Sequence, residues 1–243
     1  MKITILTLFP EMYGDFLKTS IVARSIQRGL AEVEIVDIRD YAPGSYRHVD
    51  DSPFGGGAGM ILKCQPVLDC LDDVCTEGSW KVMMSAAGTP YNQAMAHRFA
   101  ELDHLVLLCG HYEGVDQRAL DRLKAREVSI GDYVLTGGEL PAMVLIDTVA
   151  RFIDGVLAGE ESVNDESIYS GLLEYPHYSK PREYDGDTVP DILLSGNHGE
   201  IDLWRWEQAL ALTKERRPDL FEAYVRSEPA LTKKQKAILA KYM

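Results

Sequence analysis

The sequence lacks any long hydrophobic run, since no stretch approaches the roughly 20 apolar residues that a membrane-spanning helix requires. Its first ten residues hold one lysine and a short apolar segment that ends at Pro10. They lack the apolar region and the small-residue cleavage site of a secretory signal peptide. These absences argue against a membrane partner and predict a cytoplasmic protein that begins with a buried strand.

Cysteine is scarce, and its spacing matches no common metal motif. The four cysteines, Cys64, Cys70, Cys75 and Cys109, include no CxxC pair. In a cytoplasmic protein, cysteines of this kind are reduced and pack as small apolar residues. The sequence therefore predicts no metal site.

Basic residues are outnumbered in most of the chain, which carries a net charge of −13. Residues 1–175 hold 14 basic and 27 acidic residues, whereas residues 176–243 hold 11 of each, so the first part accounts for the whole excess. A uniformly acidic surface repels nucleic acid. Because the C-terminal third is neutral overall, it is the region that would not, on average, repel a polyanion. A nucleic-acid partner is therefore possible there, but the charge does not require one.

What the sequence does contain is an alternation of strand-like and helix-like segments in its first half. Its 243 residues are 46% hydrophobic and 26% charged, which is typical of a folded globular chain. Strands are expected at residues 2–9, 33–38, 80–85 and 105–109, and helices at residues 11–30, 66–73 and 92–101. Strands that alternate with helices predict an α/β fold with a parallel sheet.

Residues 129–141 are the most distinctive stretch of the chain. Gly131, Gly137 and Gly138 lie within eight residues, and an apolar, helix-like run over residues 142–157 follows. Glycine permits positive φ angles and lets a ligand approach the main chain closely. The stretch predicts either a deep loop that holds a ligand against its own backbone or a tight turn between two core elements.

Other glycine-bearing loops follow expected strands, at Gly88 and at Gly110. Ligands in open α/β sheets bind beyond the carboxyl ends of strands, so these loops and the one at Gly131 are expected to converge on one pocket. A further segment, residues 53–60, has four glycines in five positions but matches neither phosphate-loop nor dinucleotide-binding spacing. It predicts a mobile lip over a ligand or a plain linker.

The second part of the chain predicts a smaller, mainly helical domain. Residues 161–175 are polar and then sparsely apolar, which is typical of a linker, and a rigid aromatic and basic segment follows at residues 176–182. A helical pattern begins at Gly199 and stops at residues 216–218, and a short helix is expected over residues 233–242.

Four motifs occur in order through most of the chain. They are Asp-Asp-Ser-Pro-Phe-Gly-Gly-Gly at residues 50–57, Gly-His-Tyr-Glu-Gly at 110–114, the stretch 129–141, and Gly-Leu-Leu-Glu-Tyr-Pro-His-Tyr at 171–178. Any one of them is a weak signal, but the four together are very specific. With them, the chain resembles the bacterial tRNA (guanine-N1)-methyltransferases of the TrmD type.

The resemblance implies the architecture of that family. Residues 1–160 would form a SPOUT-type α/β domain with a parallel sheet and a deep trefoil knot, a rare exception to unknotted connectivity. Residues 161–175 would be an interdomain linker that orders on tRNA binding, and residues 176–243 a small helical domain that holds the tRNA. The family's active sites lie at a dimer interface, so a homodimer is expected.

The resemblance also implies a methyl donor, S-adenosylmethionine, bound in a bent shape inside the knot. By matching position, the loops at residues 83–88, 110–114 and 129–138 should hold it largely through main-chain groups. This agrees with the convergence expected from the glycines alone. The individual cofactor-binding residues expected are Met84, Gly110, Tyr112, Glu113, Gly114, Ser129, Ile130, Gly131, Asp132, Tyr133, Val134, Leu135, Gly137 and Gly138.

The methyl acceptor in the family is N1 of the guanosine immediately 3′ of the anticodon, at position 37 of tRNA. Guanine N1 is a poor nucleophile while it carries its proton, so a carboxylate must act as general base. A guanidinium near O6 must stabilise the charge that then develops, and the matching arginine is Arg151. The base must also leave its stack to reach the methyl group.

The general base departs from the family pattern. The family's aspartate usually precedes Ser-Phe, whereas here Glu166 precedes Ser-Ile, with Asp165 just before it. Glutamate can act as a base but reaches one methylene further, so Glu166 is the predicted base and Asp165 the alternative. Mg²⁺ is a possible further cofactor, although no ligand cluster identifies it. Substrate contacts implied by the match are Asp50, Pro53, Gly55, Gly56, Ser167, His177, Lys180 and Arg182.

Other interpretations exist for the same residues. Arginine on a helix face, like Arg151, commonly forms an ion pair, and a linker glutamate, like Glu166, is commonly just solvated. A methyltransferase that acts on a ribose 2′-hydroxyl would not need the motif at 171–178. A non-enzymatic RNA-binding protein would need a basic surface, and a nicotinamide dehydrogenase would need GxGxxG after the first strand. The guanine methyltransferase fits the whole pattern best.

Overall fold

The computed structural model describes residues 1–157, 168 and 170–243 of the chain. The chain divides into two compact units, Met1–Ala158 and Gly159–Met243, which are named the N-terminal and the C-terminal unit. The predicted base Glu166, its alternative Asp165 and the expected substrate contact Ser167 lie outside the described residues. Within the described ranges, no helix combines the length and the apolar character that crossing a membrane requires.

A five-stranded sheet forms the centre of the N-terminal unit. Its strands lie in the order β2-β1-β6-β5-β7, and every neighbouring pair is parallel. The predicted α/β fold with a parallel sheet is therefore confirmed. The strands are β1 (Lys2–Thr7), β2 (Glu32–Asp37), β5 (Trp80–Pro90), β6 (His104–Cys109) and β7 (Arg126–Ser129).

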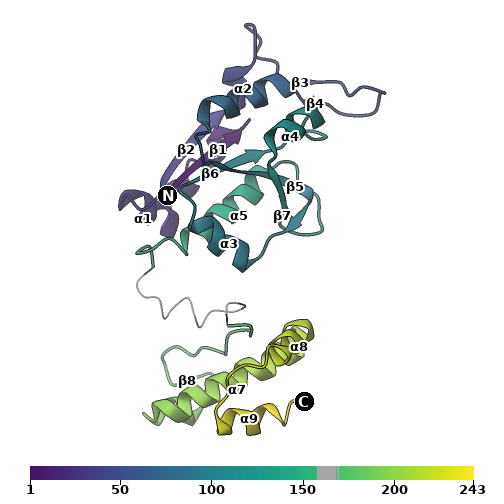
Figure 1. Ribbon diagram of the computed structural model, residues 1–243. Helices are drawn as coiled ribbons and strands as arrows, with labels where there is room; N and C mark the ends of the chain where they lie inside the picture. Colours follow the sequence, from purple (N-terminus) through teal and green to yellow (C-terminus); the bar gives the residue numbers. More distant parts are fainter. Residues whose placement is uncertain (158–167, 169) are drawn as a thin grey trace. The chain divides into compact units, whose positions relative to one another are not determined.

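Helices cover both faces of this sheet, with α1, α3 and α5 on one face and α2 and α4 on the other (Figure 1). Every residue of β6 is buried, because this strand lies in the middle of the three layers. Strands covered on both faces need no polar alternation, which explains the unbroken apolar run in β6. The helices are α1 (Ser20–Gln27), α2 (Cys64–Val74), α3 (Gln93–Ala100), α4 (Gln117–Leu123) and α5 (Glu139–Ala150).

The expected single helix over residues 11–30 is wrong. Two short 3-10 helices, η1 (Pro10–Tyr13) and η2 (Phe16–Lys18), precede α1. Thr19 is extended, with φ −120° and ψ 145°, and Ser20 has a positive φ of 57°, so the chain turns sharply where α1 begins. The interruption is coupled to packing, since Tyr13 at the end of η1 is 0% exposed.

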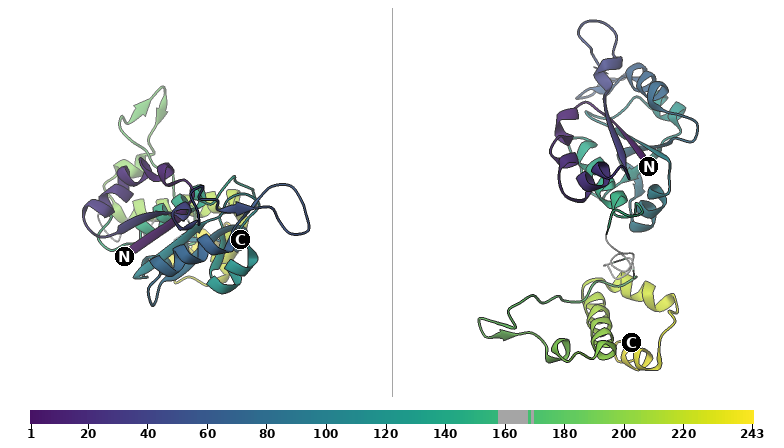
Figure 2. Two further views of the ribbon diagram at one scale, coloured as in Figure 1. Left: turned by 90° about the horizontal axis from the view of Figure 1, so that it is seen from above. Right: turned by 90° about the vertical axis from the view of Figure 1, so that its left-hand side faces the viewer.

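The glycine-rich segment expected as a lip is the tip of a short hairpin. β3 (Asp50–Asp51) pairs antiparallel with β4 (Ile61–Leu62), and the residues between them extend away from the sheet (Figure 2). η3 (Ile38–Tyr41) precedes this hairpin. Phe54 at the tip is 99% exposed, so the hairpin has a fixed base and an unpacked end.

Three helices pack together in the C-terminal unit. Leu210, Phe221 and Ile238 contribute one buried side chain from each helix. A small antiparallel hairpin and a 3-10 helix precede them in the chain. The elements are β8 (Glu183–Tyr184), β9 (Asp187–Thr188), η4 (Asp191–Leu194), α7 (His198–Arg216), α8 (Pro218–Arg226) and α9 (Lys233–Leu239).

Two features of the C-terminal unit differ from the expectations. Pro218 begins α8, a helix that was not predicted, because proline fits the first turn of a helix as well as it ends one. Leu172, expected in the linker, is 3% exposed and packs in the core of this unit. The backbone N–H of Leu173 donates to Thr213 Oγ1 at 2.8 Å, so the end of the expected linker is fastened to α7.

Candidate functional site

A cavity of about 330 Å³ lies in the N-terminal unit where β6 and β7 end. β5 contributes an irregular stretch, because its pairing with β7 shifts register between Met84 and Thr89. The strand was expected to end at Ser85, but it resumes and pairs Pro90 with Ser129. Residues from the three glycine-bearing loops line this one cavity, as the sequence predicted.

Glycine is required where two of these loops meet. The backbone N–H of Gly138 donates to the carbonyl of Gly110 at 2.8 Å, and His111 forms an antiparallel bridge with Gly137. A Cβ on Gly138 would lie 2.7 Å from Cα of Cys109, which is closer than real Cβ contacts come. The Gly137–Gly138 turn can therefore rest directly on the end of β6 only because it has no side chains.

The loop after β6 is held in place by the β3–β4 hairpin. The N–H of Glu113 donates to the Met60 carbonyl at 3.0 Å, and the N–H of Leu62 donates to the Gly114 carbonyl at 2.9 Å. Tyr112 has a positive φ of 62° and its side chain is 42% exposed. The hairpin thus braces the 110–114 loop through backbone bonds.

The loop after β7 is braced by its own residues. Ser129 Oγ accepts from the Gly131 N–H at 3.3 Å and donates to the Gly131 carbonyl at 3.2 Å. The Tyr133 hydroxyl donates to the Ile130 carbonyl at 3.3 Å. Val134 at its outer bend is 88% exposed. The loop is therefore ordered locally while it presents an apolar residue outward.

All the expected cofactor residues except Asp132 line the cavity. The residues that had not been named individually are Met83, Ser85, Ala86, Ala87, His111, Val128, Thr136 and Pro141. Most of them fall within the three loops, whereas Val128 and Pro141 fall just outside. Most of them are small or apolar residues, for which a sequence carries no chemical signature, whereas His111 belongs to the Gly-His-Tyr-Glu-Gly motif.

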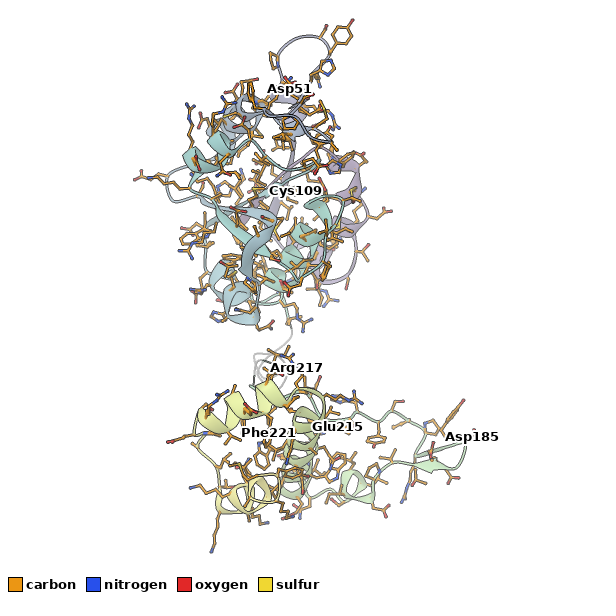
Figure 3. All side chains as sticks on the ribbon, turned by 90° about the vertical axis from the view of Figure 1, so that its right-hand side faces the viewer. Asp51, Cys109, Asp185, Glu215, Arg217 and Phe221 are labelled. Atoms are coloured by element: carbon orange, nitrogen blue, oxygen red, sulfur yellow. The ribbon has the colours of Figure 1, made fainter. Side chains whose placement is uncertain are left out.

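Four polar side chains to which the sequence assigned no functional role form a buried group behind this wall. The Thr7 hydroxyl donates to Glu139 Oε1 at 2.9 Å, and the Tyr13 hydroxyl donates to the Glu139 carbonyl at 3.4 Å. Tyr13 also lies 3.3 Å from Cys109 Sγ, and Cys109 is in the middle of the N-terminal unit (Figure 3). Burial raises the pKa of both Tyr13 and Cys109, so both are neutral near pH 7.

The predicted catalytic arginine follows the helix that begins at this wall. Arg151 is the C-terminal cap residue of α5 and is half-buried. Since α5 starts directly after the Gly137–Gly138 turn, one helix connects the cavity wall to Arg151. The predicted base cannot be related to it, because Glu166 lies outside the described residues.

The expected substrate contacts fall in two places. Asp50 begins the β3–β4 hairpin and Pro53, Gly55 and Gly56 belong to its tip, and none of the four lines the cavity described above. His177, Lys180 and Arg182 line a second cavity, of about 900 Å³, in the C-terminal unit. Tyr175, Tyr178 and Arg205 line the same cavity, so it combines aromatic rings with cations.

Several side chains that line this second cavity already contact other residues of the C-terminal unit. Arg182 pairs with Asp191 at 2.9 Å, and His177 Nε2 lies 2.9 Å from a Glu174 carboxylate oxygen. The Arg205 guanidinium lies 5.0 Å from the centre of the Tyr175 ring, and its buried Nε has no hydrogen-bond partner. Lys180 forms no ion pair with any described residue. The residues described contain no cluster of histidine, cysteine and carboxylate side chains that could hold a metal ion.

The chain is similar to known proteins over most of its length. The family model described as tRNA (Guanine-1)-methyltransferase TrmD matches residues 1–223. A protein of Lachnospira eligens is 50% identical over 229 residues, which are 93% of this chain and 97% of that protein. One of Alkaliphilus oremlandii is 48% identical over 247 residues, or 98% of this chain and 97% of that protein.

A protein of Staphylococcus aureus strain JH9 is 48% identical over 243 residues, which are 100% of this chain and 97% of that protein. All three relatives are named tRNA (guanine-N(1)-)-methyltransferase. The identity extends through both compact units, and the resemblance carried by the four motifs is confirmed. The chain belongs to the TrmD family of tRNA (guanine-N1)-methyltransferases.

Proposed function

We propose that the protein transfers the methyl group of S-adenosylmethionine to N1 of the guanosine at position 37 of tRNA, immediately 3′ of the anticodon. The observation that carries this proposal is the convergence of three glycine-bearing loops on one cavity in a chain of this family. Ligand sites in parallel α/β sheets lie at the carboxyl ends of strands, and this cavity lies at the carboxyl ends of β6 and β7.

The walls of the cavity suit a donor that is held mainly by backbone. Its volume of about 330 Å³ is at the small end for cofactor pockets, which favours a bent ligand. Gly110, Gly131, Gly137 and Gly138 leave main-chain groups accessible, while Ile130 and neighbouring apolar side chains can cover an adenine ring. We assign to the methyl donor the cofactor-binding residues expected from the sequence, except Asp132.

The proposed chemistry needs a base, an electrostatic stabiliser and an extruded nucleotide. A carboxylate, assigned to Glu166, takes the N1 proton, and N1 then attacks the methyl carbon as the carbon–sulfur bond breaks. Arg151 stabilises the negative charge that develops at O6. The extruded nucleotide is contacted in this proposal by Asp50, Pro53, Gly55, Gly56 and Ser167.

The C-terminal unit is the proposed tRNA-binding part. Its second cavity presents His177, Lys180 and Arg182 beside aromatic rings, which suits phosphates and unpaired bases. Residues 176–243 are electrically neutral overall, in contrast to the acidic remainder of the chain. We therefore expect the phosphate backbone to approach this part of the chain first.

A homodimer with active sites at its interface is part of the proposal. Leu140 and Val144 on α5 are 50% and 43% exposed, and Val134 on the adjoining loop is 88% exposed. A helix that is apolar on all sides is normally covered, so this exposed apolar surface supports a second copy packed against α5. The same surface borders the cavity wall, which would bring the partner close to the donor.

A trefoil knot in the catalytic domain is also proposed. The 131–138 segment passes directly beside the 110–114 loop, with the Gly138 N–H bonded to the Gly110 carbonyl at 2.8 Å. The His111–Gly137 bridge lies next to this bond. Such close backbone contact between segments that follow different strands supports a chain that passes through its own loop, as in a knot. Glycine at positions 110 and 138 makes this contact sterically possible.

Replacement of Gly138 by alanine should weaken binding of S-adenosylmethionine by roughly tenfold or more. The added methyl group would press on the Cys109 backbone, and overpacking of this kind typically costs about 1–3 kcal/mol. Isothermal titration calorimetry measures the loss. The matched control is Gly14→Ala, since Gly14 has φ −55° and an added Cβ makes an ordinary contact 3.5 Å from the Glu11 carbonyl. Equal binding by both variants would contradict the proposed position of the donor.

Methyl transfer to an unmodified tRNA transcript tests the proposed reaction itself. With labelled S-adenosylmethionine, label should enter a transcript with guanosine at position 37 and should map to guanine N1. A transcript with adenosine there is the control and should stay unlabelled. If neither transcript is labelled although the donor binds, the substrate assignment is wrong.

The assignment of the general base predicts a contrast between neighbouring carboxylates. Glu166→Gln should lower kcat by about 10²–10⁴-fold, the usual contribution of a general base, while Asp165→Asn should retain most activity. Single-turnover methylation of the same transcript measures both variants. Near-normal turnover in Glu166→Gln would rule out Glu166, and loss in Asp165→Asn alone would transfer the role to Asp165.

A further inference from the structure

Phe54 is the most exposed large apolar side chain in the part of the chain that the structure describes, with 99% of its surface accessible. It stands at the tip of the β3–β4 hairpin, between Pro53 and the three glycines at residues 55–57. These glycines have positive φ angles of 87°, 80° and 128°, which suit glycine and leave no side chain beside the ring. Single exposed apolar residues are common on protein surfaces, so the surroundings of Phe54 decide whether it has a role.

The hairpin that carries Phe54 is fastened to the donor cavity. An added Cβ on Gly59 would lie 2.4 Å from Cγ of Glu113, so the returning side of the tip lies against this side chain. At the base of the hairpin, the N–H of Leu62 donates to the Gly114 carbonyl at 2.9 Å. Glu113 and Gly114 both line the cavity. Phe54 therefore stands on a segment that is anchored beside the proposed donor site.

The side chains around the tip are mainly acidic. Residues 50–62 contain two aspartates and no lysine or arginine. The ammonium group of Lys63, the next residue, lies 3.7 Å from the Asp51 carboxylate, and Glu113 adds a further acidic side chain beside Gly59. A phosphate is not attracted to such surroundings, whereas an uncharged nucleobase of any sequence can stack on an aromatic ring. The tip therefore suits a base rather than a phosphate.

The proposed reaction leaves a base without a stacking partner. Guanosine 37 has to leave its stack to reach the methyl donor, and each base beside it then loses a neighbour. Proteins that unstack nucleic acids frequently insert an apolar side chain such as phenylalanine at the step that is opened. The tip at residues 53–57 does not line the donor cavity, so it can contact a base that stays outside while the guanosine enters.

We propose that Phe54 stacks on a base that loses its neighbour when guanosine 37 is extruded, and so holds the anticodon loop open for methyl transfer. This inference rests on the proposed function. Phe54 contacts the substrate away from the reacting atoms, which makes it a positioning residue. The acidic N-terminal unit thus recognises RNA by stacking, whereas the C-terminal unit binds its phosphates.

Binding of the full-length protein to a fluorescently labelled tRNA transcript, measured at several salt concentrations, tests this. Phe54→Ala should weaken binding by about tenfold to a hundredfold, the usual effect of removing one aromatic stacking partner, while Phe54→Trp should bind as the wild type does. The dependence of affinity on salt should stay unchanged in Phe54→Ala, because no phosphate contact is lost. Lys180→Ala is the contrasting variant, since loss of a phosphate contact should reduce that dependence. Calorimetry should show unchanged affinity of Phe54→Ala for S-adenosylmethionine.

Transcripts that lack one base identify the stacking partner. Each carries an abasic nucleotide on one side of guanosine 37, at position 36 or at position 38. On one of the two, the wild type and Phe54→Ala should bind with equal affinity, because the base that the ring contacts is missing.

Normal binding of the intact transcript by Phe54→Ala would overturn the proposal, as would an undiminished effect of the substitution on both abasic transcripts. Sedimentation tests the other occupant that an exposed ring could have, a second copy of the chain. Weaker subunit association in Phe54→Ala, with the loss of tRNA binding following from it, would assign the ring to a protein interface and also overturn the proposal. If the wild type neither binds nor methylates the intact transcript, the proposed function fails, and the inference with it.

Discussion

The site depends on the direct contact between the Gly137–Gly138 turn and the end of β6. The Gly138 N–H reaches the Gly110 carbonyl at 2.8 Å, and an added Cβ would come within 2.7 Å of the Cys109 backbone. Because backbone rests on backbone here, the loops after β6 and β7 are joined without intervening side chains. The cavity wall at this point is consequently formed by glycine main chain, and α5 starts from a fixed point.

A buried carboxyl group, that of Glu139, lies behind the wall that faces the cavity. The wall offers glycine backbone, apolar side chains and polar side chains such as Glu113 to a ligand, while the carboxyl group of Glu139 is buried behind it at 2% exposure. The same helix that begins at Glu139 ends next to Arg151, the proposed partner of guanine O6. Donor binding and acceptor activation would thus both be tied to the placement of α5.

The sequence predicted the sheet and most of the cavity, because buried strands and glycine turns leave local patterns. It failed where tertiary contacts override local preference. The break before α1 accompanies the burial of Tyr13, and the irregularity in β5 follows from its pairing with β7. Neither feature changes the hydrophobic periodicity of the sequence. Glu139 escaped notice because an acidic residue in the first turn of a helix is ordinary, and only its burial makes it unusual.

Amide hydrogen exchange measured with and without S-adenosylmethionine tests the central claim that three loops form one donor site through their backbone. Exchange should slow together in residues 83–88, 110–114 and 129–138, with little change in the hairpin tip at residues 53–57 in the absence of tRNA. Protection confined to the C-terminal unit, or to one of the three loops alone, would contradict the account.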